Sequence, residues 1–386
     1  MALIGLIYAR TPGSTIELAK LLSFTIIPVF LIGPIAGIYV DRWNKKYTMI
    51  FCDLLRGLLV LFIPFVITHS KSMLPVYMMV FIVFSATRFF LPSKFSIIPD
   101  IVHKDKLLLA NSLTSTTMMI ATIIGFGFGG IIVGLVGAKG GFYVDSVTYF
   151  VSAVMVSFVV MRFRGIAKSS GPREKLRKLI KKTVLDDIKE GILYIKGHKD
   201  IRMVVNTMFL LMAGVGSIYI IIIVFVQEVL KSSTEHLGLL AMCLGAGLFL
   251  GSIVYGKFGA GLCKRRVINL GLCFTGFIIV LFSVGLMLWP SFLVAGILSA
   301  VLGMFVSPIV VSANTLLHEV MKDDMRGRIF SSLDVIMHVG FLVFMLLTSM
   351  IAEWVDKGLI LAGVGTVFFL IGIVKMSRSK GRTSNT

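Results

Sequence analysis

Gly37-Ile-Tyr-Val-Asp-Arg-Trp-Asn-Lys-Lys46 is a short charged turn between two apolar runs, each long enough to cross a bilayer. The run before it, residues 16–39, carries only two charged side chains, both near its start. The run after it, residues 47–68, carries only Asp53 and Arg56. Because ~20 mostly apolar residues span the hydrocarbon core as a helix, this stretch predicts two membrane helices joined by a tight turn.

The composition of the whole chain agrees with a membrane protein. Hydrophobic residues make up 57% of the 386 residues, and the mean hydropathy is +0.96, whereas soluble domains are ~45–50% apolar. Met1 to Tyr8 is also apolar but would rise only about 12 Å as a helix, so we expect it to be the remnant of a span. Eleven further runs are long enough to be complete spans: 16–39, 47–68, 74–91, 112–136, 141–161, 201–227, 237–258, 267–288, 291–312, 329–352 and 358–376.

The basic residues alternate between the connections. Of the 38 Lys and Arg, 31 lie in or beside every second connection or in the C-terminal tail, six lie in the other connections, and Arg56 lies inside a span. Basic residues favour the cytoplasmic side of a membrane. The net charge of +19 is therefore explained by topology rather than by nucleic-acid binding, and the charged turn at Gly37 is placed in the cytoplasm.

The longest connection, from Arg162 to Arg202, holds 13 Lys and Arg and divides the chain into halves. Its apolar residues recur at helical spacing, which predicts a basic amphipathic helix that either binds anionic lipid at the membrane surface or serves as a solvated linker. We expect four regions: an N-terminal bundle 1–161, a cytoplasmic linker 162–200, a C-terminal bundle 201–376 and a cytoplasmic tail 377–386.

The two halves show traces of a repeat. The turn at Gly37 has a counterpart in residues 251–266, displaced by 214 positions, and the loop at 102–106 resembles residues 320–324, displaced by 218 positions. Duplicated halves are typical of secondary carriers whose binding site lies between the repeats. Chance similarity between short basic loops is the alternative explanation.

The order Gly37-x-Tyr-Val-Asp41-Arg42-x-x-Lys45-Lys46 resembles the signature loop of the major facilitator superfamily, and the alternating spans extend this resemblance over the whole chain. Four further segments resemble the branch of macrolide-efflux and enterobactin-exporter-like proteins: Leu31-Ile-Gly-Pro34, Cys52-Asp-Leu-Leu-Arg-Gly57, Ile98-Pro-Asp-Ile-Val102 and Arg326-Gly-Arg328.

The resemblance implies an all-α polytopic fold of two pseudo-symmetric six-helix bundles in a bacterial cell membrane. It also implies a monomeric carrier, in contact with membrane lipids, that exports small amphipathic molecules in exchange for protons, without a cofactor, metal or catalytic residues. The sequence departs from the family by lacking most of the first helix. A truncated protein that does not transport, or an importer of the same fold, are the alternatives.

The resemblance assigns Gly37, Asp41, Arg42, Lys45 and Lys46 to a gating loop. Glycine allows close helix approach, and the charged side chains can form contacts in one access state that break in the other. A merely basic inside turn is the alternative.

Glycines recur in the following spans, where Gly125, Gly129 and Gly130 predict close helix packing of the small-residue type. Exporters of the superfamily carry a proline where this chain has Phe126, so the glycines favour general packing over a directionality signal.

Ionisable residues inside spans are costly and therefore indicate function by default. Asp53 and Arg56 are spaced to form an ion pair on one helix, and Asp145 lies near the outer end of its span. Asp334 and His338 are one helical turn apart and can share a proton. We take these five as candidates for proton coupling. The alternatives are a local ion pair that only reduces the cost of Asp53 and Arg56, a first-turn helix position for Asp145, and a structural pairing of Asp334 with Arg328 near the cytoplasmic end.

Substrate contacts follow only from the family, in which four helices line the central cavity. This implies apolar, adaptable candidates at Phe81, Phe84, Met208, Phe209, Met212, Met304 and Phe305. No catalytic motif is present, and the four cysteines show no pairing pattern, so we expect no enzyme. Substrate identity and coupling ion are not encoded in any motif that we identify.

Overall fold

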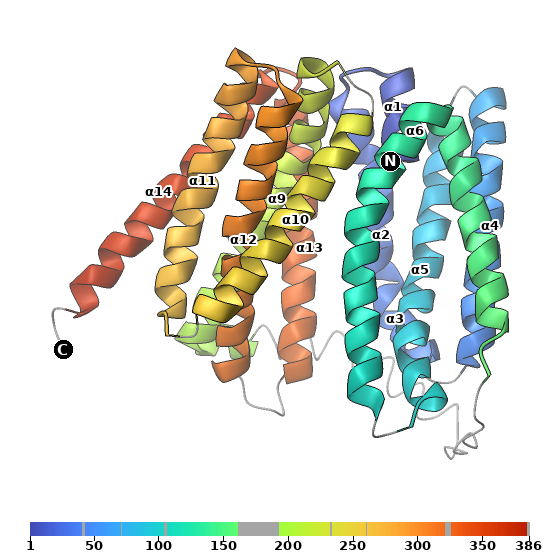
Figure 1. Ribbon diagram of the computed structural model, residues 1–386, viewed down its shortest axis with the longest axis horizontal. Helices are drawn as coiled ribbons and strands as arrows, with labels where there is room; N and C mark the ends of the chain where they lie inside the picture. The colour runs from blue at the N-terminus through green and yellow to red at the C-terminus, as the bar shows by residue number, and fades with distance from the viewer. Residues whose placement is uncertain are drawn as a thin grey trace. The chain divides into compact units, whose positions relative to one another are not determined.

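The computed structural model describes residues 1–40, 43–70, 72–103, 106–160, 193–231, 234–259, 261–320 and 326–383 (Figure 1). The elements in these residues are α-helices throughout, as the long apolar runs predict. Asp41 and Arg42 of the charged turn lie outside the described residues, as does most of the expected linker helix at 162–200.

The chain forms two compact units. Unit 1 comprises Met1–Leu6, Lys20–Thr122 and Ile132–Val184, and unit 2 comprises Ile7–Ala19, Ile123–Ile131 and Leu185–Thr386. Most of unit 1 therefore precedes the long basic connection and most of unit 2 follows it, while short pieces of three N-terminal helices belong to unit 2.

The helices of the N-terminal part begin with three short segments of apolar sequence. Helix α1 spans Ala2–Arg10, α2 spans Thr15–Leu31 and α3 spans Gly33–Val40. Residues 16–39, predicted as one span, are thus divided between α2 and α3. Pro28 inside α2 has no backbone N–H and cannot complete the helical hydrogen-bond ladder, and Gly33 begins the next helix. The Ile32 amide still donates to the Pro28 carbonyl over 2.9 Å, so α3 follows directly.

The next three helices are long. Helix α4 spans Lys45–His69, α5 spans Leu74–Ile101 and α6 spans Leu107–Ser157. Helix α5 runs ten residues beyond the expected end at 91, because Pro92 is accommodated inside it; membrane helices tolerate proline where neighbours satisfy the freed carbonyl. Helix α6 contains both the 112–136 and 141–161 runs. Gly137 bends it with a φ of 75° and a ψ of 171°, a conformation that glycine adopts without steric cost.

The C-terminal part is built from six helices of 24 to 31 residues: α9 (Lys199–Val229), α10 (Glu235–Phe258), α11 (Lys264–Leu288), α12 (Phe292–Val320), α13 (Arg326–Ile351) and α14 (Lys357–Thr383). Their core is aliphatic and centres on α9, with Ile201, Leu272, Ile309 and Leu317 fully buried. Among the described residues, nine helices are long and apolar enough to cross a membrane, and the bent α6 is one of them.

An internal repeat relates residues of unit 1 to residues of unit 2 by one constant displacement in residue number. In unit 1 the Lys45 ammonium at the start of α4 lies 2.7 Å from the Asp100 carboxylate of α5. In unit 2 the Lys264 ammonium at the start of α11 lies 2.7 Å from the Glu319 carboxylate of α12. Both residues of the second pair follow their counterparts by 219 positions (264 − 45 and 319 − 100). The repeat seen in the sequence is therefore also present in the structure. Its displacement is 219 residues, rather than the 214 and 218 residues that separate the similar loops.

The same displacement relates a close helix crossing in each unit. In unit 1 a Cβ added at Gly57 of α4 would lie 3.0 Å from the Phe150 ring of α6. In unit 2 a Cβ added at Gly276 of α11 would lie 2.4 Å from the backbone nitrogen of Phe369 in α14. Helices α4 and α11 thus occupy equivalent places, so every residue of one has a counterpart in the other.

Candidate functional site

A buried charged cluster lies in the middle of unit 1. The Asp53 and Arg56 side chains of α4 form an ion pair and are 1% and 6% exposed, respectively. The Ser152 hydroxyl of α6 donates a hydrogen bond to the other Asp53 carboxylate oxygen over 2.7 Å. The expected pairing of these two charges therefore forms, and it joins α4 to the second half of α6.

Arg56 has further partners that surround its guanidinium. Its Nε donates to the Cys52 carbonyl over 3.2 Å, and an Nη donates to the Thr87 hydroxyl of α5 over 3.4 Å. The guanidinium carbon lies 4.3 Å from the centroid of the Phe90 ring and 4.7 Å from that of the Tyr149 ring. Such cation–π contacts are worth ~2 kcal/mol when desolvated. Arg56 is thus held as a fixed positive charge by three helices.

Asp145 is the third charged member of this cluster. It precedes Tyr149 by one helical turn on α6 and is exposed, and two positive charges act on its carboxylate, the Met1 amino group first and the Arg56 guanidinium second. The Thr148 hydroxyl donates to the Asp145 backbone carbonyl, whereas the Asp145 carboxylate forms no hydrogen bond within the described part of the chain. Asp53 is therefore the fixed counter-ion, and Asp145 is the less restrained carboxylate.

The equivalent crossing in unit 2 contains no such charges. The counterparts of Asp53 and Arg56, 219 positions later, are Leu272 and Thr275 of α11, which are 0% and 3% exposed. The two crossings share the same close-packed glycine and the same phenylalanine position. The same crossing is thus present in unit 2 with an uncharged pair, and the charges of unit 1 are not a requirement of the architecture.

Asp334 and His338 lie together on α13, as their spacing predicts. His338 Nδ1 is 3.4 Å from a carboxylate oxygen of Asp334 and 2.9 Å from its backbone carbonyl oxygen. Their side chains are 55% and 34% exposed, so this pair differs from the buried Asp53–Arg56 pair. The side chain of Arg328, the other expected neighbour of Asp334, lies outside the described residues.

The signature turn is described only in part. Lys45 donates to the Ser96 carbonyl as well as to Asp100, both over 2.7 Å, and so fixes the start of α4 against the end of α5. The Lys46 backbone amide donates to the Asn44 side chain, which caps α4. Gly37 belongs to α3. The described half of the turn thus positions α4, with no contact that distinguishes two access states.

The glycines of α6 differ in their surroundings. A Cβ added at Gly130 would lie 2.8 Å from the Gly238 Cα of α10, whereas one added at Gly125 would meet nothing within 4 Å. Gly129 is half-buried. Close packing therefore concentrates at Gly130.

The expected cavity residues lie in several places. Phe81, Phe84 and Met212 are half-buried, and Met304 is 37% exposed. Met208 packs in the core of unit 2. Phe209 contacts Phe344 edge to face, and Phe305 stacks on Phe274 at 4.8 Å between ring centroids. None of the seven lines the pocket described next.

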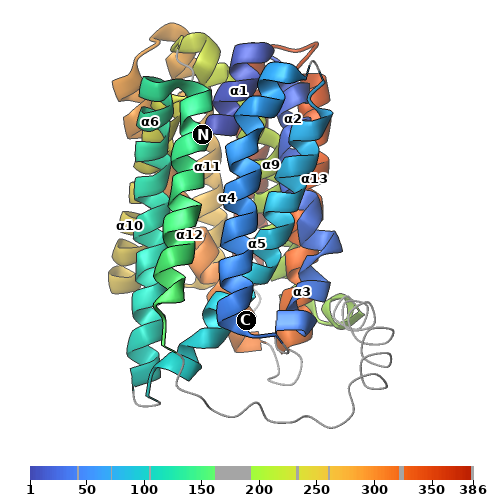
Figure 2. The same cartoon turned by 90° about the vertical axis from the view of Figure 1, so that its right-hand side faces the viewer.

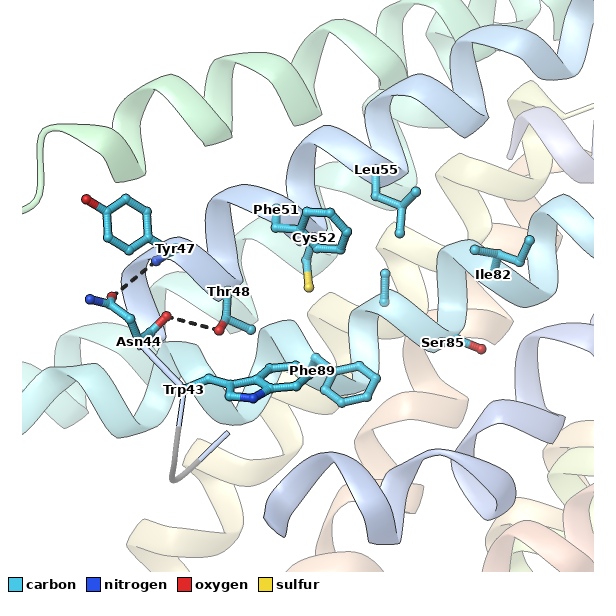
Figure 3. Close-up of a pocket in the computed structure, with 11 residues that line it drawn as sticks. Trp43, Asn44, Tyr47, Thr48, Phe51, Cys52, Leu55, Ile82, Ser85 and Phe89 are labelled. Atoms are coloured by element: carbon cyan, nitrogen blue, oxygen red, sulfur yellow. Dashed lines mark hydrogen bonds between the residues drawn. The ribbon is translucent and has the colours of Figure 1, made fainter. Parts of the chain in front are cut away.

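Helices α4 and α5, side by side in Figure 2, enclose an apolar pocket of about 690 Å³ within unit 1. Figure 3 shows that Cys52 points into it from α4 and that Trp43 lies beside Phe89 at one end. The helical spacing of Trp43, Tyr47 and Phe51 near the start of α4 is a sequence signal for one wall of this pocket, although not for the pocket itself. The lining residues are Trp43, Asn44, Tyr47, Thr48, Phe51, Cys52, Leu55, Ile82, Ser85, Ala86 and Phe89.

Comparison with known proteins gives a consistent result. Two overlapping segments, residues 1–283 and 204–385, match the sequence model of the Major Facilitator Superfamily. The macrolide efflux protein A of Streptococcus pyogenes is 20% identical over 97% of this chain and 90% of its own length. A homologue of the multi-drug resistance efflux pump PmrA from Lactococcus lactis is 26% identical over 94% of this chain and 85% of its own length.

Solved structures agree at the level of the fold. The nucleoside transporter NupG covers 97% of this chain and 93% of its own, with a TM-score of 0.73 at 12% identity. A bacterial homologue of the human lysosomal transporter Spinster, in an inward-facing conformation, covers 97% of this chain and 90% of its own, with a TM-score of 0.65 at 14% identity.

Proposed function

The chain belongs to the major facilitator superfamily, and from this premise we propose that it exports small amphipathic molecules from a bacterial cell in exchange for protons. Members of this family are transporters rather than enzymes, and the chain is a multi-pass protein of the bacterial cell membrane. The substrate class is suggested by relatives whose names refer to macrolide efflux and multi-drug resistance.

The observation that carries the proton coupling is the charged cluster formed by the buried Asp53–Arg56 pair and Asp145, a residue that is itself exposed. Ionisable groups inside a membrane are costly and mark ion pathways by default. The equivalent crossing in unit 2 has uncharged residues at the positions of Asp53 and Arg56, so the helix crossing does not require the charges. A function specific to unit 1 is the remaining physical reason for keeping them.

The charges of the cluster suggest how it would work. With both carboxylates ionised the three side chains carry two negative charges and one positive charge, and Arg56 stays protonated at all relevant pH values. A proton bound by Asp145 would make the sum of these three side-chain charges zero, which is the cheaper state in a low-dielectric environment. Asp53 is already held by Arg56 and Ser152. We therefore assign proton exchange to Asp145 and charge compensation to the Asp53–Arg56 pair.

The test uses the purified protein in sealed vesicles that enclose a pH-sensitive dye. In energised inverted vesicles an exporter should carry macrolides or other amphipathic compounds into the lumen and protons out of it, so that substrate accumulates inside while the dye reports a rise in the pH of the lumen. Accumulation only in right-side-out vesicles would instead identify an importer. If no compound in the panel moves protons or accumulates in either orientation, the transport proposal fails and the non-transporting alternative stands.

The double variant Asp53→Leu/Arg56→Thr gives this test a matched control, because it installs the pair that unit 2 carries. We expect it to remain in the membrane in normal amounts and to lose proton movement. Wild-type coupling in this variant would remove the cluster from the mechanism.

A further inference from the structure

The pocket between α4 and α5 has a polar end and an apolar end. Trp43, Asn44 and Tyr47 form one end, at the first turn of α4, and the walls beyond them are built from Phe51, Leu55, Ile82 and Ala86 among others (Figure 3). Asn44 holds the polar end in shape, since its side-chain oxygen accepts hydrogen bonds from the Lys46 and Tyr47 amides over 3.1 and 3.3 Å. The pocket is thus an amphipathic groove.

The groove adjoins a face of α4 that is exposed and apolar along its whole length. Tyr47 and Phe51 are 68% and 66% exposed and belong both to the groove and to this face. Such an unbroken apolar stripe on a membrane-spanning helix faces hydrocarbon. Because the start of α4 lies on the basic side, the groove opens into the cytoplasmic leaflet. The exposed stripe consists of Tyr47, Phe51, Leu54, Leu58, Leu61, Phe62 and Phe65.

The groove is found between α4 and α5 of unit 1, whereas the equivalent helices of unit 2, α11 and α12, are filled differently at two of its positions. The counterparts of Leu55 and Ala86, 219 positions later, are Phe274 of α11 and Phe305 of α12. These two rings stack at 4.8 Å with an interplanar angle of 23°. In unit 2 an aromatic pair thus occupies the positions that smaller side chains hold beside the groove in unit 1.

The polar end of the groove presents hydrogen-bond donors. The Trp43 indole is a donor only, and the Asn44 amide retains its NH₂ after its oxygen is used. Lys46 does not line the pocket, but its backbone amide donates to the Asn44 side chain, and it directly precedes the lining residue Tyr47, so its ammonium is a donor beside this end. Among the residues that the structure describes, no acidic side chain lines the pocket. The neighbouring Lys45 is already paired with Asp100, whereas the Lys46 ammonium has no ion-pair partner among the described residues. This end therefore favours a negatively charged group rich in acceptors.

We propose that the groove binds one anionic phospholipid of the cytoplasmic leaflet, with an acyl chain along the apolar wall and its phosphate at Lys46, Trp43 and Asn44. The acyl chain gains little by leaving other lipid tails, because the bilayer is as apolar as the groove. Selectivity for this lipid therefore comes from the donors at the polar end. This assignment is independent of the proposed export activity.

The experiment measures retained lipid by native mass spectrometry on the full chain, purified from vesicles containing phosphatidylglycerol and phosphatidylcholine with identical acyl chains. The wild type should retain phosphatidylglycerol in preference. Lys46→Gln should weaken this retention about fivefold, the factor that corresponds to ~1 kcal/mol for one basic residue at an anionic surface. Arg265→Gln, at the equivalent position of unit 2, serves as the matched control and should retain the lipid as the wild type does.

A second variant tests the location. Leu55→Phe/Ala86→Phe installs the aromatic pair of unit 2 and should abolish selective retention, and a phosphatidylglycerol with a photoreactive acyl chain should label α4 and α5 of the wild type but not of this variant. Equal retention of the two lipids by the wild type would overturn the proposal. Photoreactive lipid that labels α11 and α12 of the wild type as much as α4 and α5 would also overturn it. The same holds if Lys46→Gln retains phosphatidylglycerol at the wild-type level, and this result does not depend on whether the double variant folds.

Discussion

Asp53 and Arg56 illustrate how much a buried charge depends on its partner. Both side chains are almost fully buried, so removing one of them leaves the other uncompensated, whereas removing both with apolar replacements is often neutral. Unit 2 shows an uncharged version in place, with Leu272 and Thr275 buried. The pair is thus separable from the stability of the fold, which is what makes it suitable for mutagenesis.

We predict that Arg56→Thr alone destabilises the protein by about 3–5 kcal/mol, because Asp53 would then lie buried without its counter-ion. Asp53→Leu/Arg56→Thr should recover most of that loss. Thermal unfolding in detergent, followed by fluorescence, compares the two variants with the wild type. A double variant that is no more stable than the single one would show that the charges also hold the helices together.

A second prediction concerns Asp145. Asp145→Asn removes the carboxylate that is least restrained and should abolish proton-driven accumulation, while exchange of substrate across the membrane without a proton gradient continues. Glu353→Gln, an exposed acidic residue after α13, is the control and should accumulate substrate normally. Proton-driven accumulation by Asp145→Asn at the wild-type rate contradicts the role that we assign to this residue.

At the scale of the helix, packing depends on where backbones touch. A Cβ added at Gly238 of α10 would lie 2.5 Å from the Phe126 carbonyl oxygen and 2.8 Å from the Gly130 Cα. These are backbone atoms, which cannot rotate away as a flexible side chain can. At Gly125, by contrast, the space around an added Cβ is open.

We therefore predict that Gly238→Ala lowers the free energy of unfolding by roughly 1–3 kcal/mol, as over-packing does. Gly125→Ala should leave stability unchanged or raise it by up to ~1 kcal/mol through helix propensity. The midpoints of thermal unfolding in detergent measure both. Equal midpoints for the two variants would mean that α6 and α10 do not cross at this point.

The sequence predicts the bounds of these helices well where a long apolar run sets them. It predicts them less well where a single proline or glycine decides whether the helix ends, continues or bends. The apolar run at 47–68 became Lys45–His69 with its Asn44 cap. The expected span 74–91 stops before Pro92, yet α5 continues past it to Ile101, because the cost of a proline depends on neighbours that a linear pattern does not contain. The bend at Gly137 likewise depends on one backbone conformation.

For the molecule as a whole, the decisive feature is the 219-residue register. Sequence similarity between the loops indicated a repeat but not its exact displacement, because the two halves differ in loop length. The Lys45–Asp100 and Lys264–Glu319 ion pairs give the same displacement, 219 residues, for both of their members. Only in this register does Leu55 correspond to Phe274 and Ala86 to Phe305. The groove could not be predicted from the sequence because it depends on this comparison and on the packing of two helices.

The repeat also makes a prediction about topology. Equivalent ion pairs at the starts of α4 and α11 imply that both helices begin on the same side, which the distribution of Lys and Arg assigns to the cytoplasm. Cys263 is exposed immediately before α11. A membrane-impermeant maleimide should therefore label Cys263 in inverted vesicles and leave it unlabelled in right-side-out vesicles.

The control for this experiment is Glu353→Cys in a Cys263→Ser background, because residue 353 follows α13 in a connection that the charge distribution assigns to the outer side. It should show the opposite labelling pattern. Labelling of Cys263 from outside would reverse the orientation of the chain, and the groove beside Lys46 would then open into the outer leaflet. An anionic lipid of the cytoplasmic leaflet could not reach it, so the topology measurement also tests the physical premise of the lipid site.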